Sequence, residues 1–344
     1  ILVNYIANKS TIKAGSIEMV GASDGLYSPA AFQYGSGYGV LFYGSIEATN
    51  NIDIAGWSRN NGDAVRIGSG NQIKSFSGNI DILGMIQSTP AAVNVLGTIS
   101  ALNGAVTVTG GSSLKAPGSY FTAISRAEFL TGTSTTGGAV QGIYANNATI
   151  EGVNVTLQSP QSTNAAPQIG VQIQGTSKVN ASSSLKIDVQ STSTTSAATR
   201  ILGTSTLSGA TIDIKSDTLE LNSTATTSPV TAANSVTIAP RTSGLAVKLG
   251  TNDTLTSPRV LGLSQSELDQ IATSKLTIGS SSTGNITVAS AVSTKDATGD
   301  LALITNGDLA INAALQSGTN SGKSLTFSLT GSGSATQSGE LKTN

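Results

Sequence analysis

Short alternations of apolar and polar residues, each bounded by Gly, Asn or Ser, recur along the chain and constrain its fold more than any other feature. Typical triplets lie at residues 52–54, 80–82, 93–95, 106–108, 212–214, 219–221, 286–288, 309–311 and 325–327. Because successive side chains of a β-strand point to opposite faces, each triplet places two apolar side chains inward and one side chain outward. Strands this short are not stable alone, so we expect them to stack as repeated units around a shared core.

The spacing of the triplets predicts the coils of a β-solenoid. Inward apolar residues recur at similar intervals, from Ile52 to Ile73, Val93 to Leu114, Ile212 to Val236, Leu276 to Leu301 and Leu301 to Leu325. Each of these intervals falls within the period of about 20–29 residues that known solenoid repeats have. We therefore predict an all-β fold consisting of a single right-handed parallel β-helix.

We expect one continuous β-solenoid over residues 1–344, because the core of a solenoid grows along one axis as each coil is added. Residues 1–60 are richer in aromatic side chains, residues 61–330 read as regular coils, and residues 331–344 read as a Gly/Ser-rich tail. The chain starts at Ile1 in apolar alternation, which suggests a processed or excised piece of a longer polypeptide.

A single helix is predicted near residue 265. Ser264 and Glu267 have the spacing of a capping box, and Leu263 and Leu268 stand at the positions of a hydrophobic staple. These signals predict a short helix over residues 265–271, with a return to strand at Leu276.

Composition excludes several classes of function. Only 11% of residues are charged, and 18 basic and 19 acidic residues give a net charge of −1 without any basic run. Binding to a nucleic acid or to an anionic membrane surface requires clustered Lys and Arg, so we expect neither partner. The sequence has no stretch of about 20 apolar residues, so we also expect no membrane insertion. The chain has no Cys and no His, which removes disulfides, thiolate zinc sites and imidazole bases. The "G-G-x-G-x-D" pattern and the spaced-Asp loop of an EF-hand, which would bind calcium, are absent as well. We therefore expect no cofactor and no metal site.

Residues 236–288 contain an "I-x-P-R-T" element, an "L-G-L-S-x-x-E-L-D-x-I" turn and an "L-T-I-G…G-x-I-T-V" exit. This run resembles a unit repeated in the filamentous-haemagglutinin-like adhesins, which are very large bacterial exoproteins exported by two-partner secretion. The resemblance implies a right-handed parallel β-helix, a location at the cell surface or outside the cell, and a role in adhesion, biofilm or cell contact. The chain lacks the Asn-Pro-Asn-Gly-type motifs of the family's secretion domain, so it would correspond to shaft, and the resemblance supplies no active site.

A polysaccharide-cleaving enzyme on the same fold is a less favoured alternative. Glycoside hydrolysis needs two carboxylates about 5–9.5 Å apart across one bond. Asp53, Asp81, Asp213 and Glu220 each stand singly, as the outward member of a triplet. Outward carboxylates on neighbouring coils could pair, but solvated surface charges explain all four. We therefore predict no catalytic residues and no enzymatic activity.

An aromatic cluster gives the chain its one candidate ligand surface. Tyr27, Tyr34, Tyr38, Tyr43 and Trp57 lie within a short stretch of a sequence that is only 4% aromatic. Exposed rings of this kind stack on sugars or on a partner protein. The alternative is that the rings cover an open end of the solenoid or pack a loop against its wall.

These observations predict a structural extracellular rod, either an adhesin shaft or a subunit of a surface fibre. Its partners would be copies of itself, added end to end by strand pairing, or a glycan or protein on a host or cell surface. The alternative function is a glycan- or receptor-binding module that uses the aromatic surface.

Overall fold

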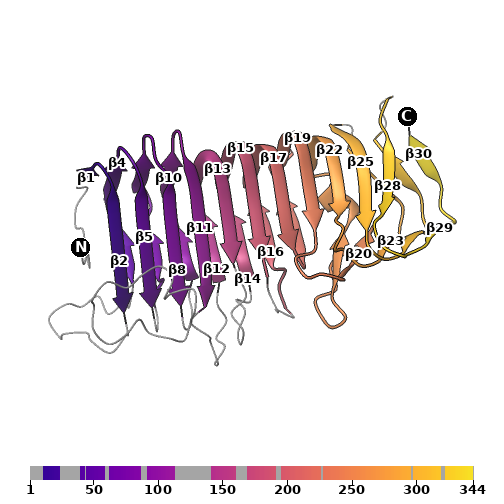
Figure 1. Ribbon diagram of the computed structural model, residues 1–344, viewed down its shortest axis with the longest axis horizontal. Helices are drawn as coiled ribbons and strands as arrows, with labels where there is room; N and C mark the ends of the chain where they lie inside the picture. The colour runs from indigo at the N-terminus through magenta and orange to yellow at the C-terminus, as the bar shows by residue number, and fades with distance from the viewer. Residues whose placement is uncertain are drawn as a thin grey trace.

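The computed structural model describes residues 11–23, 39–42, 44–58, 62–86, 91–112, 141–159, 169–190, 195–225, 228–295, 297–318 and 322–343. These residues form an elongated stack of β-strands in which successive coils add along the long axis (Figure 1). Every strand ladder in this part of the chain is parallel, and the one antiparallel contact is an isolated bridge between Thr254 and Val260. The predicted all-β parallel β-helix is therefore confirmed.

The largest sheet, which we call sheet A, has 15 strands and runs the length of the stack. Its main path consists of β1 (Thr11–Ala14), β4 (Ser45–Ala48), β7 (Gln72–Ser75), β10 (Thr98–Ala101), β13 (Thr149–Ser159), β15 (Lys178–Val189), β17 (Thr206–Ser216), β19 (Val230–Ala239), β22 (Ile271–Gly279), β25 (Thr298–Thr305) and β28 (Leu325–Leu329). A second row consists of β2 (Ile17–Ser23), β5 (Ile52–Ser58), β8 (Ile80–Ile86) and β11 (Ala105–Ser112). Both rows join at β13, which pairs with β10 and with β11.

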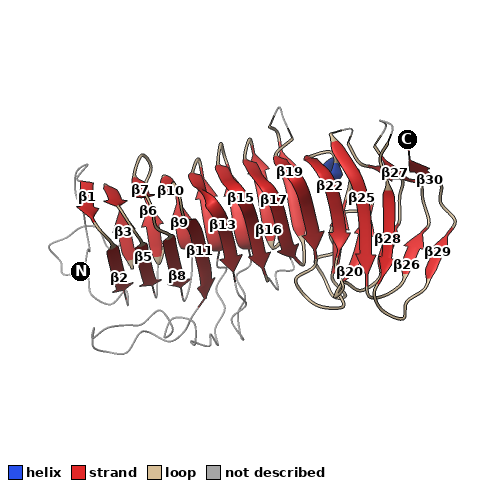
Figure 2. Ribbon diagram, turned by 45° about the horizontal axis from the view of Figure 1, so that its top comes forward, coloured by secondary structure: helices blue, strands red, loops and turns tan. Residues whose placement is uncertain are grey.

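Three smaller sheets close the coils (Figure 2). Sheet B contains β3 (Val40–Phe42), β6 (Val65–Ile67), β9 (Ala91–Val95), β12 (Gln141–Asn146), β14 (Ile169–Gln174), β16 (Thr199–Gly203) and β18 (Leu219–Ser223). Sheet C contains β21 (Val260–Leu263), β20 (Ala246–Leu249), β23 (Ile286–Val288), β26 (Leu309–Ile311) and β29 (Ala335–Gln337). Sheet D contains β24 (Val292–Ser293), β27 (Leu315–Ser317) and β30 (Leu341–Thr343).

The core is one stack of aliphatic side chains that extends from Ile17 to Leu315. Strand pairing aligns the inward residues of successive coils into ladders. One ladder on sheet A contains Ile52, Ile80, Val106, Val155, Leu185, Ile212, Val236, Leu276, Leu301 and Leu325. Burial of these side chains is the main stabilising contribution, because each coil covers the apolar face of the next.

The predicted coil spacing is confirmed in the C-terminal half and is wrong in the N-terminal half. Val236, Leu301 and Leu325 are register partners of the residues one predicted interval earlier. Ile52 instead pairs with Ile80, and Ile73 belongs to the other row of sheet A. Each N-terminal coil contributes two short strands to sheet A, so the nearest apolar triplet in the sequence lies in the same coil rather than in the next. The interval from Val93 to Leu114 does not mark a coil either, because the register partners of Val93 are Val65 and Ile143. Leu114 lies outside the described residues.

The helix near residue 265 is present but shorter than predicted. α2 spans Gln265–Leu268 and is the one helix among the described residues. The carboxylate of Glu267 accepts the N–H of Ser264 at 2.9 Å, as the capping-box spacing predicts. The chain returns to strand at Ile271 rather than at Leu276, because Ile271 pairs with Val230 of β19.

The segment expected to be a Gly/Ser-rich tail also differs from its prediction. Within residues 331–343, β29 pairs with β26 and β30 pairs with β27. Gly and Ser dominate this segment, yet its strands continue the coil pattern, because parallel pairing uses backbone groups that every residue supplies.

Candidate functional site

The predicted aromatic surface does not include Trp57. Its side chain points out of the coil from β5 but is only 2% exposed, and it clusters with Ala55, Leu83 and Met85. Trp57 is directly opposite Met85, and Ala55 is opposite Leu83. Its burial therefore rules out Trp57 as a ligand platform. The sequence did carry a signal for this cluster, since β5 and β8 both have apolar residues at two outward positions. Tyr27, Tyr34, Tyr38 and Tyr43 lie outside the residues that the structure describes.

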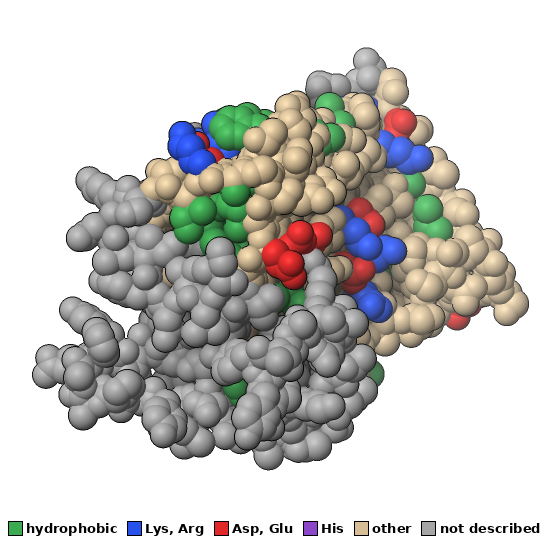
Figure 3. Space-filling view, turned by 60° about the vertical axis from the view of Figure 1, so that its left-hand side comes forward, with side chains coloured by type: hydrophobic (Ala, Val, Ile, Leu, Met, Phe, Trp, Pro, Cys, Tyr) green, Lys and Arg blue, Asp and Glu red, His purple; other side chains and the backbone are tan. Residues whose placement is uncertain are grey.

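The outward carboxylates divide into two groups. Asp53 and Asp81 are opposite each other on β5 and β8. Asp213 is instead opposite Lys186 of β15, and Glu220 forms an ion pair with Arg200. Acidic and basic side chains accordingly gather side by side on one face of this weakly charged molecule (Figure 3).

A row of polar side chains follows the outer face of sheet B, one from each coil. In register order it contains Arg66, Asn94, Tyr144, Gln172, Arg200 and Glu220. Parallel strands are about 4.8 Å apart, so consecutive members of the row lie within reach of one another. We call this set the sheet B row.

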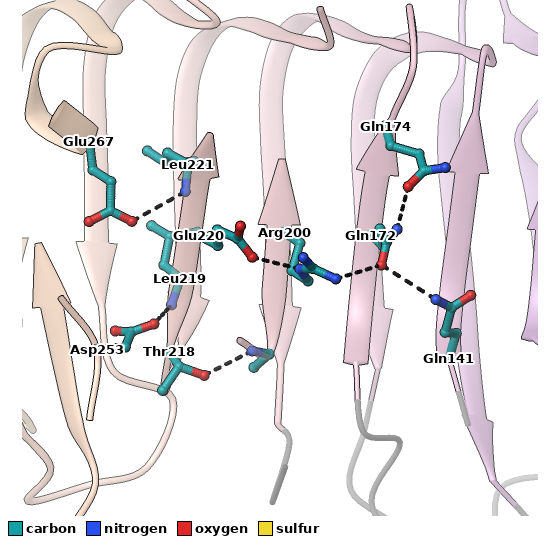
Figure 4. Close-up of polar contacts among 11 residues, drawn as sticks. Gln141, Gln172, Gln174, Arg200, Thr218, Leu219, Glu220, Leu221, Asp253 and Glu267 are labelled. Carbon is teal, nitrogen blue, oxygen red and sulfur yellow. Dashed lines mark hydrogen bonds and ion pairs between the residues drawn. The ribbon is translucent and has the colours of Figure 1, made fainter. Parts of the chain in front are cut away.

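Hydrogen bonds connect the central members of the sheet B row (Figure 4). Arg200 donates from Nε to Oε2 of Glu220 at 2.6 Å and from Nη1 to Oε1 of Gln172 at 3.4 Å. The Nε2 of Gln174 donates to the hydroxyl of Tyr144 at 2.6 Å. Arg200 is 25% exposed and Glu220 is 35% exposed, so this ion pair lies at the edge of solvent. The contacts tie four neighbouring coils together.

The N-terminal end of the sheet B row contains a buried carboxylate, Asp63. It accepts hydrogen bonds from Nδ2 of Asn94 at 2.8 Å, from the N–H of Ala91 at 3.1 Å and from Nη1 of Arg66 at 3.3 Å. Burial raises the pKa of Asp63, and these hydrogen bonds together with the charge of Arg66 offset part of that rise.

The opposite end of sheet B meets sheet C at an unusual junction, which we call the carboxylate joint. β18 is the last strand of sheet B and β21 is the first strand of sheet C. The two strands do not pair. Asp253 lies between them and accepts the N–H of Leu219 on β18 at 2.7 Å and the N–H of Gly262 on β21 at 2.8 Å.

Glu267 repeats this arrangement one step along β18. One of its oxygens accepts the N–H of Leu221 at 3.2 Å, and the other accepts the N–H of Ser264 at 2.9 Å. Gln270 completes the set, because it accepts the N–H of Ser223 at 2.9 Å and donates to the carbonyl of Leu221 at 2.7 Å. Three side chains thus satisfy the edge of β18 where a further strand would otherwise pair.

The two carboxyl groups of the carboxylate joint are perturbed by burial. Desolvation raises the pKa of Asp253 to about 8, against the opposing effect of its two backbone hydrogen bonds. Burial also raises the pKa of Glu267. The negative charge of Glu220 acts in the same direction on both groups. Perturbed pKa values often mark active sites, although structural networks perturb them as well.

The hydrogen bonds favour the structural interpretation of the carboxylate joint. Both oxygens of Asp253 and both oxygens of Glu267 already accept backbone N–H groups. A general acid or base must instead reach a substrate proton within about 3 Å. Among the described residues, no three acidic side chains are placed to hold a metal ion together.

None of the helical residues in the described part of the chain forms an apolar segment long enough to span a membrane. Comparisons with protein-family models, with curated proteins and with solved structures find no match to this chain.

Proposed function

We propose that the chain is a length of structural rod in an extracellular assembly, either the shaft of a filamentous-haemagglutinin-like adhesin or the subunit of a surface fibre. The observation that carries the proposal is the single aliphatic core, which extends from Ile17 to Leu315 through coils that all pair in parallel. Each added coil lengthens such a core along one axis, and its continuous packing resists bending. The chain therefore forms a stiff, elongated body.

The position of the family-like run supports the choice of adhesin shaft. Residues 236–288 cover the end of β19, the carboxylate joint, β22 and β23. The "L-G-L-S-x-x-E-L-D-x-I" element supplies both Glu267 and the start of β22. The residues that carry the resemblance therefore form the coil in which sheet C takes over from sheet B.

A structural role rather than a catalytic one is part of the proposal. The buried carboxylates of Asp63, Asp217 and Glu267 bind backbone N–H groups, and Glu220 is paired with Arg200. Within the sheet B row, Arg200 bonds to Gln172 and Glu220 on the two neighbouring coils, which suits a cross-coil ladder.

We propose that the rod associates with copies of itself by strand addition. β28, β29 and β30 each form one end of their sheet, and Leu325, Phe327, Leu329 and Leu341 pack against the core beside them while staying partly exposed. Strand edges with adjacent apolar side chains favour pairing with another strand.

Electron microscopy of the purified native material tests these proposals. Fibres with an axial repeat near one subunit length would support end-to-end association, and separate short rods would support a shaft without self-association. Compact particles would contradict the rod. Labelling of intact cells with an antibody against the chain tests the location, and a signal that appears only after cell lysis would refute an extracellular role.

A further inference from the structure

The last described coil ends in three strand edges, at the yellow end of the stack in Figure 1. β28, β29 and β30 are the final strands of sheets A, C and D, so each has a register partner on one side only among the described residues. Leu325, Phe327 and Leu329 of β28 pack against the core and stay partly exposed, as does Leu341 of β30. Edge N–H and C=O groups beside exposed apolar side chains favour the addition of a further strand.

The first described coil offers less apolar surface. Ile17 and Met19 of β2 are 7% and 3% exposed, and Val40 of β3 is 3% exposed. On β1, Ile12 is partly exposed and Ala14 is exposed. The two ends also differ in arrangement, because sheet A contributes β1 and β2 to the first coil and β28 alone to the last. Contact between two C-terminal ends therefore buries more apolar surface than contact between unlike ends.

We propose that two copies of the chain associate tail to tail, with their last coils in contact across a two-fold axis perpendicular to the rod. The proposal rests on the strand addition proposed as part of the function, and it specifies the partner as a second copy in the opposite orientation. A two-fold contact of this kind is closed, so it produces a rod of two chains instead of an endless fibre.

The two-fold axis determines which strands meet. It reverses the strand direction of the second copy, so pairing across the contact is antiparallel. With the axis through the middle of sheet A, β28 meets β28 of the second copy, β29 meets β30, and β30 meets β29. The strand lengths agree with this arrangement, because β28 pairs with itself and β29 and β30 have three residues each.

The register that keeps the core continuous is centred on Phe327. In this register Phe327 is opposite Phe327 of the second copy, and Leu325 is opposite Leu329. All three side chains are on the inward side of β28, since their register partners on β25 are buried. The side chains that are partly exposed in one chain thus cover those of the other, and this burial stabilises the contact.

The outward side chains of the contact place no like charges opposite each other. On sheet A, Thr326 is opposite Ser328 of the second copy. On the other two faces, Thr336 of β29 is opposite Lys342 of β30, and both point outward between inward neighbours. Lys342 forms an ion pair with Glu340 of its own chain at 2.9 Å. The contact therefore pairs hydroxyl with hydroxyl and hydroxyl with ammonium.

Light scattering of the whole chain over a range of concentrations, together with electron microscopy, tests the contact. We expect a reversible dimer and particles about twice as long as the single rod, since two coil stacks are joined end to end. Fibres of many subunits would overturn the tail-to-tail orientation, because they require contacts between unlike ends. Single rods at every concentration would overturn the contact and leave the proposed rod intact, whereas compact particles would refute the rod itself.

Opposite charges at Thr336 test which strands meet. Thr336→Lys places a lysine opposite Lys342 of the second copy, and the two-fold axis repeats this repulsion, so the Kd of the dimer should rise about tenfold. Thr336→Glu places a carboxylate there and should lower the Kd, and both shifts should shrink at high salt. Thr336 is exposed and outward, so neither variant changes the core.

Thr11→Lys and Thr11→Glu are the matched controls, because Thr11 is exposed on β1 at the opposite end of the rod. They should leave the Kd of the dimer unchanged, and a shift in these variants would place the N-terminal end in the contact and overturn the proposal. Equal Kd values for Thr336→Lys and Thr336→Glu would overturn the pairing of β29 with β30.

A single cysteine tests the register, because the chain has no Cys of its own. Opposite residues of an antiparallel pair have Cα atoms about 4.5–5.5 Å apart, which a disulfide can span. Phe327→Cys should therefore form a disulfide-linked dimer under oxidising conditions. Thr326→Cys is the control and should form much less, since Thr326 is opposite Ser328 and not opposite itself. Equal cross-linking of the two variants would overturn the register centred on Phe327.

Discussion

At the scale of single residues, several acidic side chains in the described structure act as acceptors for backbone N–H groups. The groups bound in this way are Asp63 to Ala91, Asp217 to Thr242, Asp253 to Leu219 and Gly262, Glu267 to Leu221 and Ser264, Asp300 to Ser324, and Asp308 to Ser334. Most of these bonds connect neighbouring coils, where a turn leaves a donor without a strand partner. A solenoid has such turns in every coil. Even in a chain of which only 11% is charged, carboxylates therefore accept hydrogen bonds from backbone N–H groups at these turns.

Asp253 makes the stability of the fold depend on pH. Its pKa is about 8 in the folded chain and about 3.8 in the unfolded chain, so the folded state binds the extra proton between these values. The stability linked to this group is therefore complete below about pH 4 and is lost as the pH rises to about 8. Denaturant unfolding at a series of pH values should show a free energy of unfolding that falls over this range. In Asp253→Asn the fall should be smaller, and an unchanged slope would contradict the assignment.

Gly84 occupies a position where a side chain does not fit. A Cβ added there would lie 2.1 Å from the carbonyl oxygen of Ala92, because Gly84 in β8 packs closely against the backbone of β9. We expect Gly84→Ala to lower the free energy of unfolding by about 1–3 kcal/mol, the usual cost of overpacking. Gly15→Ala is the matched control, since a Cβ at Gly15 meets nothing within 4 Å. Equal denaturation midpoints for the two variants would show that the contact between β8 and β9 can relax.

At the scale of strands, opposite charges align across sheet A and oppose a shift in register. Lys186 and Asp188 of β15 lie opposite Asp213 and Lys215 of β17, respectively. A slip of two residues keeps the apolar side chains inward but would place Lys186 opposite Lys215. Apolar alternation alone does not exclude such a slip, so these charges help to specify the pairing.

A charge-swap cycle tests this contribution. Asp213→Lys places two lysines opposite each other and should lower the free energy of unfolding by about 1 kcal/mol. The double variant Lys186→Asp with Asp213→Lys should recover most of that loss, because opposite charges again face each other. The coupling energy from the four proteins should shrink at high salt. Additive effects of the two substitutions would indicate that the pair does not contribute.

At the scale of the whole molecule, stability is distributed along the axis, because each coil contacts only its neighbours. A coil can then be removed if the register on both sides is kept. Lys178 is the register partner of Thr206, so residues 178–205 constitute one coil of β15 and β16.

Deletion of residues 178–205 should leave a folded rod that is shorter by about 4.8 Å, with β13 pairing to β17 and β14 to β18. Circular dichroism should retain its β signal, and thermal unfolding should remain cooperative. Deletion of residues 178–189 is the control, because it removes β15 but leaves the rest of the coil out of phase. This variant should lose cooperative unfolding. Equal behaviour of the two deletions would argue against independent coils.

The alternating triplets determined the fold class by themselves. Val, Ile and Leu at every second position can be buried only in short strands, and strands that short are stable only in a stack. The same local reasoning located α2, because capping-box contacts join residues that are three positions apart. The spacing of the triplets also predicted the coil period correctly in the part of the chain where each coil has one strand in sheet A, as between Ile212 and Val236.

Other features were decided by the tertiary structure, because they depend on which coils become neighbours. Trp57 is buried and clusters with Leu83 and Met85, which lie in the following coil. The helix ends early because Ile271 pairs with Val230. The carboxylate joint was not predicted, since it brings Asp253 and Glu267 to the edge of β18, 34 and 46 residues away in the sequence. Alternation records which side of a strand faces the core, whereas the length of each turn and insert determines which strands meet.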